Sequence, residues 1–451
     1  MQKSLDRKLA AIHADPSGAK DFILADAKDA DMAFGIGAPG QSPEMHAGEV
    51  RLRTLAEYRE QIRQIARQGL VDIMLMSASS NDELTIREGL FEQSHVTPAA
   101  RANDTSDVFA VRHGRYVTEP ARPFRSALVD HIQCGHVDCR PEERARGADL
   151  GLYSVTFNNR LEDDLITLEN YRLFREEAER KGFRHFLEVF DPNAAEGLAA
   201  ADVPKFTNDM IARTLAGVAG AGRPVFLKIV YHGPKAMEEL VAYDPHLVVG
   251  ILGGGAGTTY DAFKLIAEAQ KYGARAALFG RKINSAECQL AFVEMLRRIV
   301  DGQIGPEEAV RAYHGVLAKL KIKPRRLLEE DMTLQTAVMS YGGSSASVPR
   351  AVPAAKPATV GRAAAAHVPH SDGHDHEHGP CACNGPDPHK CECDTKSDTA
   401  AQPAAARPIL ASANGAAAPN VAQASGKPDF SRMTAADKLA WNKAQRDRIF
   451  G

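Results

Sequence analysis

Short apolar runs alternate with longer amphipathic segments over the first 345 residues of the chain. Eight of the runs are rich in β-branched, aromatic or small apolar residues and have the length of buried strands. We expect strands at residues 21–27, 71–78, 107–114, 150–157, 183–190, 224–231, 247–254 and 276–283. Segments with apolar residues at helical spacing follow most of them. Repeated strand and helix units predict parallel strands with crossover helices, and eight units predict a closed (β/α)8 barrel of the α/β class.

An open, doubly wound sheet is the alternative architecture for such a pattern. That fold usually carries a glycine fingerprint directly after its first strand. The residues at this point of the chain read LADAKDADMAFG and do not supply the fingerprint. The barrel, over residues 1–345, is therefore the favoured prediction.

A lysine lies in the middle of the apolar run RPVFLKIVYHG. Strand alternation places Lys228 on the same face as Phe226 and Val230, and the opposite face is wholly apolar and suits packing against helices. We therefore expect Lys228 to point into the barrel. Burial disfavours the ammonium form of a lysine, and a neutral amine is a nucleophile. The common alternative is a lysine that reaches solvent or pairs with a carboxylate.

The same alternation predicts two carboxylates inside the barrel. In the run FLEVF, Glu188 lies on the face opposite two aliphatic residues, and in the run DFILADA, Asp26 shares a face with Phe22 and Leu24. Active sites of (β/α)8 barrels lie at the C-terminal ends of the strands. We expect Asp26, Glu188 and Lys228 to converge there. An ion-pair network without a catalytic role is the alternative.

Glycines cluster where the last two strands end, in the runs ILGGGAGTT and LFGRKIN. Glycine lets backbone N–H groups approach an anion closely, and the N-terminus of the following helix favours negative charge. Phosphate sites in these barrels follow strands seven and eight, and an arginine there adds fork-shaped donors. We expect a phosphate cradle at Gly254, Gly255, Gly257, Gly280 and Arg281. A tight turn is the alternative explanation of the glycines.

Three of these runs resemble a known family. The lysine of VFLKIVYHG, the run FLEVF and the segment GGGAGTTYDAFKLIAEAQKYGARAALFGRKI are similar to the class I, Schiff base forming aldolases of the deoxyribose phosphate, tagatose bisphosphate and archaeal fructose bisphosphate aldolase superfamily. The resemblance is clearest over residues 150–320. It implies a (β/α)8 fold and carries the imine lysine, the acidic residues and the phosphate site over to Lys228, Asp26, Glu188, Gly254, Gly255, Gly280 and Arg281. The tagatose branch has a lysine on strand four, where LGLYSVTFNN has none.

The resemblance implies an aldehyde-lyase activity, the reversible carbon–carbon cleavage of a phosphorylated ketose or related sugar phosphate without a cofactor. Lys228 is expected to form the imine, and Asp26 or Glu188 to relay protons. Tyr153 and Tyr231 are candidates to reprotonate the enamine.

Two other functional classes fit the same barrel. One is a non-covalent isomerase or epimerase of phosphosugars, in which Lys228 is only an electrostatic clamp. The other is an inactive barrel that serves as a scaffold for the tail. Lys28 and Lys235 are the alternative nucleophiles.

Three of the seven cysteines, Cys134, Cys139 and Cys288, lie in the body of the chain. Because they are few and dispersed, we expect reduced thiols rather than disulfides. Cys134, His136 and Cys139 lie in the segment 115–147 and are spaced like part of a metal site, so metal-dependent aldol chemistry is an alternative to the imine. A loop with incidental ligands is the favoured interpretation.

The composition changes near residue 345. Residues 346–428 are rich in alanine and proline and are predicted to form a disordered linker. Within them, residues 367–393 concentrate thiolates and imidazoles, which favour zinc, copper or nickel. The expected ligands, without a role in catalysis, are Cys381, Cys383, Cys391, Cys393, His374, His376 and His378. An incidental low-complexity spacer is the alternative.

Residues 429–451 regain a helical pattern, with Thr434 as a helix N-cap and Trp441 among the apolar positions of one side. A helix this short is marginal alone and must dock to persist. Such a helix on a flexible tether resembles the cargo peptides that direct enzymes into bacterial microcompartment shells, so we expect it to bind a partner or shell protein. The alternative is that it folds back on its own barrel or frays.

Charge and hydropathy narrow the remaining possibilities. A formal net charge of −3 without a dominant basic block argues against a nucleic-acid partner. No apolar run is long enough to cross a bilayer, and the start of the chain lacks the apolar core of a secretory signal. We expect a cytoplasmic homo-oligomer that acts on a phosphorylated sugar, within a bacterial microcompartment if the C-terminal helix docks there.

Overall fold

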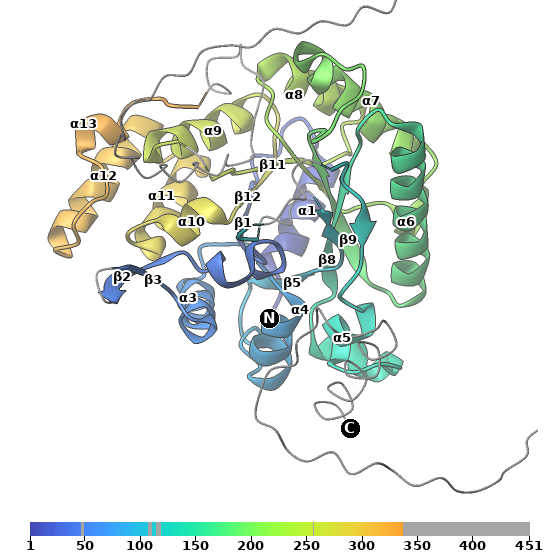
Figure 1. Cartoon of the computed structure of the whole chain (residues 1–451), viewed down its shortest axis with the longest axis horizontal. Coiled ribbons are helices and arrows are strands. Elements are labelled where there is room, and N and C mark those ends of the chain that lie inside the picture. Colours follow the sequence, from blue (N-terminus) through green and yellow to red (C-terminus); the bar gives the residue numbers. More distant parts are fainter. Residues whose placement is uncertain (47–48, 107–110, 114–118, 256, 337–451) are drawn as a thin grey trace, which may run out of the picture. The chain divides into compact units, whose positions relative to one another are not determined.

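The computed structural model describes residues 1–46, 49–106, 111–113, 119–255 and 257–336. Eight parallel strands close into a barrel in the order β1-β4-β5-β8-β9-β10-β11-β12, and helices surround them (Figure 1). The barrel strands are β1 (Ile23–Lys28), β4 (Ile73–Met76), β5 (Thr97–Arg101), β8 (Leu150–Thr156), β9 (Arg184–Phe190), β10 (Leu227–Ile229), β11 (Val249–Leu252) and β12 (Ala276–Phe279). The predicted (β/α)8 barrel is confirmed.

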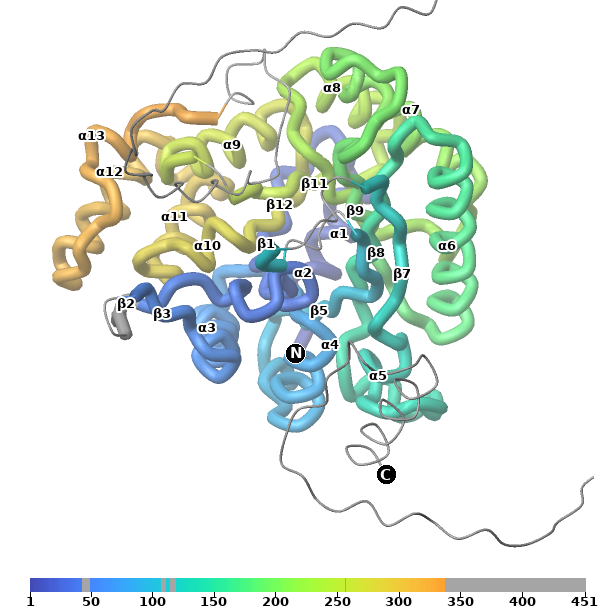
Figure 2. Tube along the Cα trace, in the orientation of Figure 1, coloured from blue at the N-terminus to red at the C-terminus, as the bar shows by residue number. Residues whose placement is uncertain are grey.

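The ring of helices follows the chain around the barrel, as the colours of Figure 2 show. The helices are α1 (Ser4–Ala14), α2 (Asp31–Phe34), α3 (Leu55–Gln68), α4 (Ala78–Asn81), α5 (Val129–Cys134), α6 (Leu161–Arg180), α7 (Val203–Ala216), α8 (Pro234–Tyr243), α9 (Thr259–Lys271), α10 (Arg281–Ser285), α11 (Gln289–Val300), α12 (Pro306–Lys319) and α13 (Leu328–Asp331). Two small antiparallel sheets pair β2 (Gln41–His46) with β3 (Glu49–Leu52) and β6 (Asp104–Thr105) with β7 (Pro123–Phe124).

The prediction of the third strand is wrong. The third barrel strand is β5, which reads TPAAR, and not residues 107–114. Of the latter, 107–110 and 114 lie outside the described residues, and 112–113 form a turn. Proline and alanine have a low preference for strands, so TPAAR carries no strand signal of its own. Burial of all five residues between β4 and β8 stabilises it as a strand nevertheless.

Two hydrophobic clusters lie on the two faces of the barrel sheet. The inner cluster takes residues from six of the eight strands, from the positions just before β10 and β11, and from α1, which closes the N-terminal end of the barrel. Its members include Leu5, Leu9, Ile23, Ala25, Ile73, Ala99, Leu150, Leu152, Phe186, Phe226, Val248, Ala276 and Leu278. The outer cluster packs the other face of the strands against the helices. Membership of one cluster or the other therefore tells which way a strand residue points.

Asp26 points outward, which contradicts its predicted place inside the barrel. Its neighbours in the sheet, Met74 and Phe279, belong to the outer cluster. Lys28, two residues along β1, donates to Asp26 Oδ1 at 3.1 Å and to Asn284 of α10 at 2.6 Å. Burial raises the pKa of Asp26 and lowers that of Lys28, each opposed by the charge of the other. Asp26 shares a face with Phe22 and Leu24, as alternation predicts, but that face is the outer one, and the inner face of β1 is equally apolar.

A buried histidine lies on the same outer face. His185 of β9 packs edge-on against Tyr171 and Phe174 of α6, and its Nε2 lies 2.8 Å from the hydroxyl oxygen of Tyr171. Burial, with a smaller contribution from the nearby charge of Arg175, lowers the pKa of His185 to about 3. The imidazole is therefore neutral in the folded protein at pH values where it is protonated in the unfolded chain.

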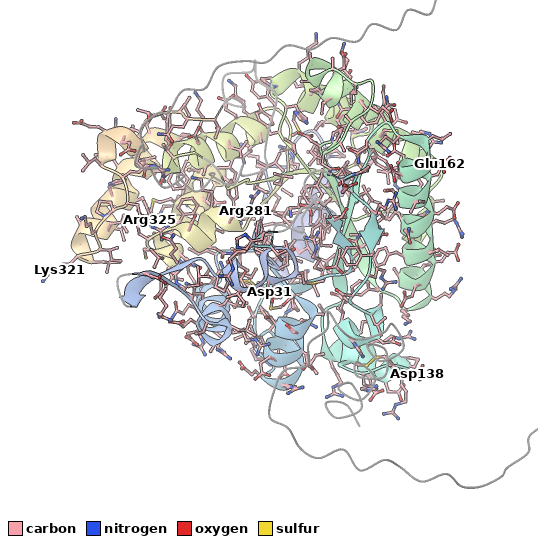
Figure 3. All side chains as sticks on the ribbon, viewed as in Figure 1. Asp31, Asp138, Glu162, Arg281, Lys321 and Arg325 are labelled. Atoms are coloured by element: carbon pink, nitrogen blue, oxygen red, sulfur yellow. A yellow bond between two sulfur atoms is a disulfide. The ribbon has the colours of Figure 1, made fainter. Side chains whose placement is uncertain are left out.

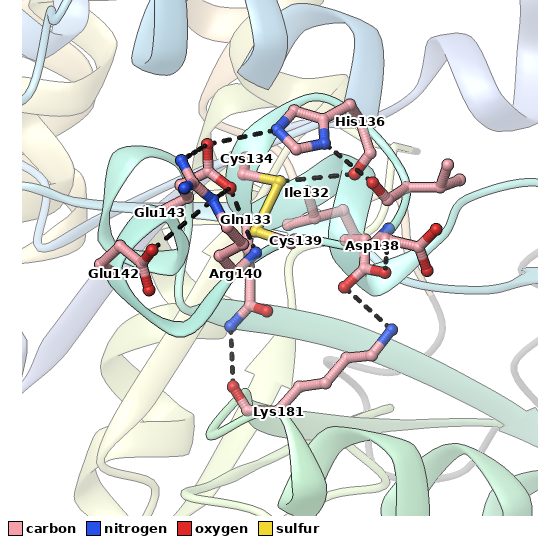
Figure 4. Close-up of a disulfide and its surroundings, with 12 residues drawn as sticks. Ile132, Gln133, Cys134, His136, Asp138, Cys139, Arg140, Glu142, Glu143 and Lys181 are labelled. Carbon is pink, nitrogen blue, oxygen red and sulfur yellow. Dashed lines mark hydrogen bonds and ion pairs between the residues drawn. A yellow bond between two sulfur atoms is a disulfide. The ribbon is translucent and has the colours of Figure 1, made fainter.

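The prediction of reduced thiols is wrong for two of the three cysteines in the barrel part of the chain. Cys134, at the end of α5, forms a disulfide with Cys139, as Figure 4 shows. Gly135, with a φ of +88°, starts the turn that brings them together. His136 faces away from them, since its Nδ1 donates to a backbone carbonyl and its Nε2 lies 3.6 Å from Glu143. In the described part of the chain, no three His, Cys, Asp or Glu side chains are arranged to hold a metal.

Three sequence predictions concern residues beyond 336. The linker at 346–428, the His- and Cys-rich segment 367–393 and the helix at 429–451 all lie outside the described residues and stay predictions. Over the described ranges, no helix is both long and apolar enough to cross a membrane.

Replacement of His185 by glutamine is expected to flatten the pH dependence of stability. The folded pKa is depressed, so its contribution to stability is present above the unfolded pKa of about 6.5 and is lost as the pH falls toward 3. Between pH 6 and pH 4, the wild type should lose about 1.4 kcal/mol per pH unit relative to His185→Gln. Urea unfolding at a series of pH values measures this. The exposed His131→Gln serves as control and should keep the wild-type slope; equal slopes for all three proteins would contradict the prediction.

Removal of one partner of the Asp26–Lys28 pair should be costly. Lys28→Met leaves a buried carboxylate without its cation, and we expect the free energy of unfolding to fall by about 3–5 kcal/mol. The double variant Asp26→Leu/Lys28→Met replaces both charges and should recover most of that loss, as measured by urea unfolding at pH 7. Arg172→Met, which removes an exposed ion pair with Glu176, should cost less than about 1 kcal/mol. If the double variant loses as much free energy of unfolding as Asp26→Leu and Lys28→Met lose together, the two charges are not coupled.

Candidate active site

Lys228 and Glu188 lie side by side inside the barrel. They are direct partners in the pairing of β10 with β9, and Lys228 Nζ lies 2.6 Å from Glu188 Oε1. Both side chains are buried, with 8% and 3% of their surface exposed. Phe226 and Phe186, two residues earlier on each strand, belong to the inner cluster. The predicted inward direction of both side chains is confirmed.

A network of polar side chains fixes the position of Glu188. The hydroxyl of Ser154 on β8 donates to Glu188 Oε2 at 2.7 Å, and Arg101 on β5 donates to Ser154 Oγ at 2.9 Å. The same guanidinium lies 3.8 Å from Glu188 and donates to Asp29 at 2.8 Å. Burial opposes the charge of Arg101, but Asp29 and Glu188 outweigh it and raise its pKa. Three inward residues, Asp29, Arg101 and Ser154, thus surround the lysine–glutamate pair.

Asp29 takes the position inside the barrel that was predicted for Asp26. It continues the inward alternation of Ile23, Ala25 and Ala27 just past the end of β1. Its carboxylate is held by Arg101 and is buried. An inward carboxylate from strand one is therefore present, three residues later than expected.

The two predicted tyrosines lie outside the barrel. Tyr153 belongs to the outer cluster and stacks on Phe174 of α6, with ring centroids 4.5 Å apart. Burial raises its pKa, against the opposing charge of Arg125. Tyr231, which follows β10, belongs to the same outer cluster. The alternation of their strands directs both phenols to the helix layer, so the structure contradicts the expectation that they serve the lysine.

The glycine-rich loop after β11 needs its glycines. Gly254 and Gly257 have φ values of +58° and +79°, which are unfavourable for other residues. A Cβ at Gly280, after β12, would lie 2.6 Å from the carbonyl oxygen of Ala27. Gly255 lies against Arg281, since a Cβ there would be 3.1 Å from the arginine Nε. The five residues predicted to form a phosphate cradle therefore lie in the two segments that follow β11 and β12, where Gly255 lies against Arg281.

Arg281 provides a positive charge at the loops that follow β11 and β12. Its guanidinium lies over the ring of Phe34, 5.6 Å from the ring centroid, and makes no hydrogen bond or ion pair with other residues that the structure describes. Burial lowers its pKa, with the charge of Glu188 opposing. Figure 3 labels Arg281 toward the middle of the view. A largely buried guanidinium without a carboxylate is suited to bind an anion.

The N-terminus of α9 does not contribute to such a site, although the sequence suggested that it would. Thr258 and Asp261 form a capping box there, and the Asp331 carboxylate accepts the backbone N–H of Thr259 at 2.8 Å. Asp261 also accepts the backbone N–H groups of Gln335 and Thr336. Carboxylates of the chain itself occupy this helix end, which leaves the loop backbone and Arg281 for an anion.

A second pair lies just past the ends of the same two strands. His232 Nε2 is 2.8 Å from Asp191 Oδ1, and both side chains are about nine-tenths buried. His232 follows β10 and continues the inward alternation of Lys228 and Val230, whereas Asp191 follows β9. The motif KIVYHG contained this signal, because its lysine and histidine are spaced four residues apart on one face of a strand.

Comparisons with known proteins complete the description. No protein-family model and no curated protein matches the chain. A solved Schiff base forming fructose-1,6-bisphosphate aldolase is 14% identical over 65% of this chain and 99% of its own, with a TM-score of 0.47. An archaeal fructose 1,6-bisphosphate aldolase is 15% identical over the same shares, with a TM-score of 0.47. The fructose-bisphosphate aldolase of Slackia heliotrinireducens is 13% identical over 69% of this chain and 91% of its own, with a TM-score of 0.48. The reaction is therefore inferred from the site itself.

Proposed function

We propose that the protein is a class I aldolase, an aldehyde-lyase that reversibly cleaves a carbon–carbon bond of a phosphorylated ketose or related sugar phosphate through an imine on Lys228. The observation that carries the proposal is the Lys228–Glu188 pair inside the barrel, with Nζ 2.6 Å from Oε1. An amine held this close to a carboxylate can lose its proton and attack a carbonyl carbon. The resemblance of the sequence runs around Lys228 to Schiff base aldolases supports the same reaction.

Imine formation uses the groups around Glu188. As Lys228 attacks the ketone carbon, Glu188 takes a proton from the amine and can return it to the departing hydroxyl group. Loss of water from the carbinolamine leaves a protonated imine. Ser154 and Arg101 hold Glu188 in place through the 2.7 Å and 3.8 Å contacts, so the carboxylate need not reorganise during these transfers.

Cleavage needs a base at the substrate hydroxyl group next to the bond that breaks. Removal of that proton lets the hydroxyl become an aldehyde, and the bonding electrons pass to the imine nitrogen to give an enamine. Asp29 and the His232–Asp191 pair are the inward groups suited to accept and return protons. Protonation of the enamine and hydrolysis of the imine then free Lys228 and the second product.

The phosphate group of the substrate is assigned to the loops after β11 and β12. The backbone N–H groups of Gly254 and Gly255 and the guanidinium of Arg281 form the cradle. Because Arg281 has no carboxylate partner within the described structure, its guanidinium N–H groups can donate two hydrogen bonds to one anion. A phosphate held there fixes the distance between the carbonyl carbon and Lys228, and such positioning lowers the barrier.

An imine should be trapped on Lys228. Borohydride reduction in the presence of ketose phosphates is expected to add the mass of a carbonyl product to the peptide that contains Lys228. Lys228→Met should lose the adduct and the turnover, whereas Lys235→Met, at an exposed position of α8, should keep both. Aldehyde release and peptide mass spectrometry give the two measurements. Turnover without an adduct would indicate a non-covalent isomerase or epimerase, and neither signal on the whole panel would indicate a scaffold.

Loss of the Arg281 guanidinium should weaken substrate binding. Arg281→Ala is expected to raise KM for the phosphorylated substrate by one to two orders of magnitude, about 1.4–2.7 kcal/mol. The same variant should leave the low activity on the unphosphorylated sugar unchanged. Arg213→Ala, at an exposed position of α7, provides a control for the lost charge. If Arg281→Ala raises KM equally for the phosphorylated and the unphosphorylated substrate, the arginine does not bind the phosphate.

A further inference from the structure

A polar hollow of about 1070 Å³ opens at the N-terminal end of the barrel. Its wall is formed by α1, the loop before β1, the segments that precede β4 and β12, and the end of α11. The hollow is therefore at the opposite end of the strands from Lys228 and Arg281. Its volume is in the range of pockets that hold small-molecule ligands.

The charges on the wall are unequal. Three carboxylates face six cationic side chains there, and the cations are Lys3, Arg7, Lys8, Lys20, Arg275 and Arg297. The carboxylates are Asp21, Asp72 and Asp301. The net charge of the wall is positive, so the hollow attracts anions and disfavours cations.

Two of the cations form ion pairs within the protein. Lys8 and Arg297 both contact Asp72 Oδ2, at 2.8 Å and 2.7 Å. Burial opposes the charge of Asp72, but the two cations outweigh it and lower its pKa. A third cation, Lys3, donates to three backbone carbonyl oxygens, which fixes it without neutralising it. These residues form the wall of the hollow and are not available to a ligand.

Arg275 and Lys20 have no such partners. Neither side chain makes a hydrogen bond or ion pair with the residues that the structure describes, and Arg275 Nε is buried without an acceptor. Ser4 Oγ, on the same wall, is also buried without a partner. Among the side chains that the structure describes, Arg7 contacts only that of Asp21, at a long 3.5 Å, and the Arg7 side chain is 58% exposed. Unpaired buried donors are rare in folded proteins, and a ligand that accepts hydrogen bonds would satisfy them.

We infer that this hollow is a second anion-binding site, separate from the mouth of the barrel, which takes a small multivalent anion between Arg275, Lys20 and Arg7. Two or more negative charges match the cations that the wall leaves unpaired, and oxygen acceptors match the orphaned donors of Arg275 and Ser4. The assignment does not depend on the reaction at the other end of the barrel. Arg275 immediately precedes β12, and Arg281 follows the strand after Gly280, so one strand connects the two sites.

Pyrophosphate is a suitable probe, and calorimetric titration measures its binding. Arg281→Ala serves as the background, so that the loops at the mouth do not contribute. In that background we expect saturable binding that weakens at least tenfold in Arg275→Gln and several-fold in Lys20→Gln. Arg275→Lys should keep part of the affinity because it keeps the charge. Arg213→Gln, an exposed arginine of α7, should bind as tightly as the background protein.

Succinate, titrated in parallel, distinguishes a phosphate from a carboxylate ligand. Equal heats for both anions would indicate a site that reads charge alone, whereas binding of pyrophosphate only would indicate a phosphate site. Arg275→Gln removes no ion pair, so its melting temperature should stay near that of the background. If Arg275→Gln does not fold, the exposed pair Arg7→Gln/Lys20→Gln gives the same test. Binding that is unchanged in these variants, or absent at millimolar pyrophosphate, would overturn the inference.

Discussion

Closure of the sheet into a barrel gives every strand residue one of two environments, and neither contains bulk water. A charge on a strand must therefore find its counter-charge on the same face or lose solvation without compensation. The protein does this twice in similar form. Asp26 pairs with Lys28 against the helices, and Glu188 pairs with Lys228 inside the barrel. The outer pair holds α10 through Asn284, and the inner pair carries the proposed imine chemistry.

The sequence was sufficient for the architecture and for the central lysine. Seven of the eight expected strands overlap barrel strands, because buried parallel strands leave continuous apolar runs. Lys228 and Glu188 could be placed because the opposite faces of their runs are wholly apolar. The same rule does not place Asp26, because the inner face of β1 is apolar as well. Local alternation separates two faces but does not say which of them is the inside.

The rest of the site depends on contacts that are distant in the sequence. Arg101 lies on β5, whose residues have little preference for a strand, and its partners Asp29 and Ser154 are 72 and 53 residues away. The Cys134–Cys139 disulfide was missed for a different reason. The small number and the dispersion of the cysteines predicted reduced thiols, whereas the turn at Gly135 decides the distance between Cys134 and Cys139. Long-range pairing and backbone conformation are the two kinds of information that a residue pattern does not contain.

The segment that covers the N-terminus of α9 determines where the C-terminal part of the chain starts. Asp261 and Asp331 anchor residues 331–336 beside Gly257, at the end of β11. Residues 337–451 are thus joined to the barrel at the rim of its proposed catalytic mouth, rather than at the face closed by α1. A partner that binds the predicted helix at 429–451 would have an effective concentration at the mouth set by the length of the connecting chain. Under the proposed reaction, an aldehyde product would leave the barrel at the same rim from which this part of the chain starts.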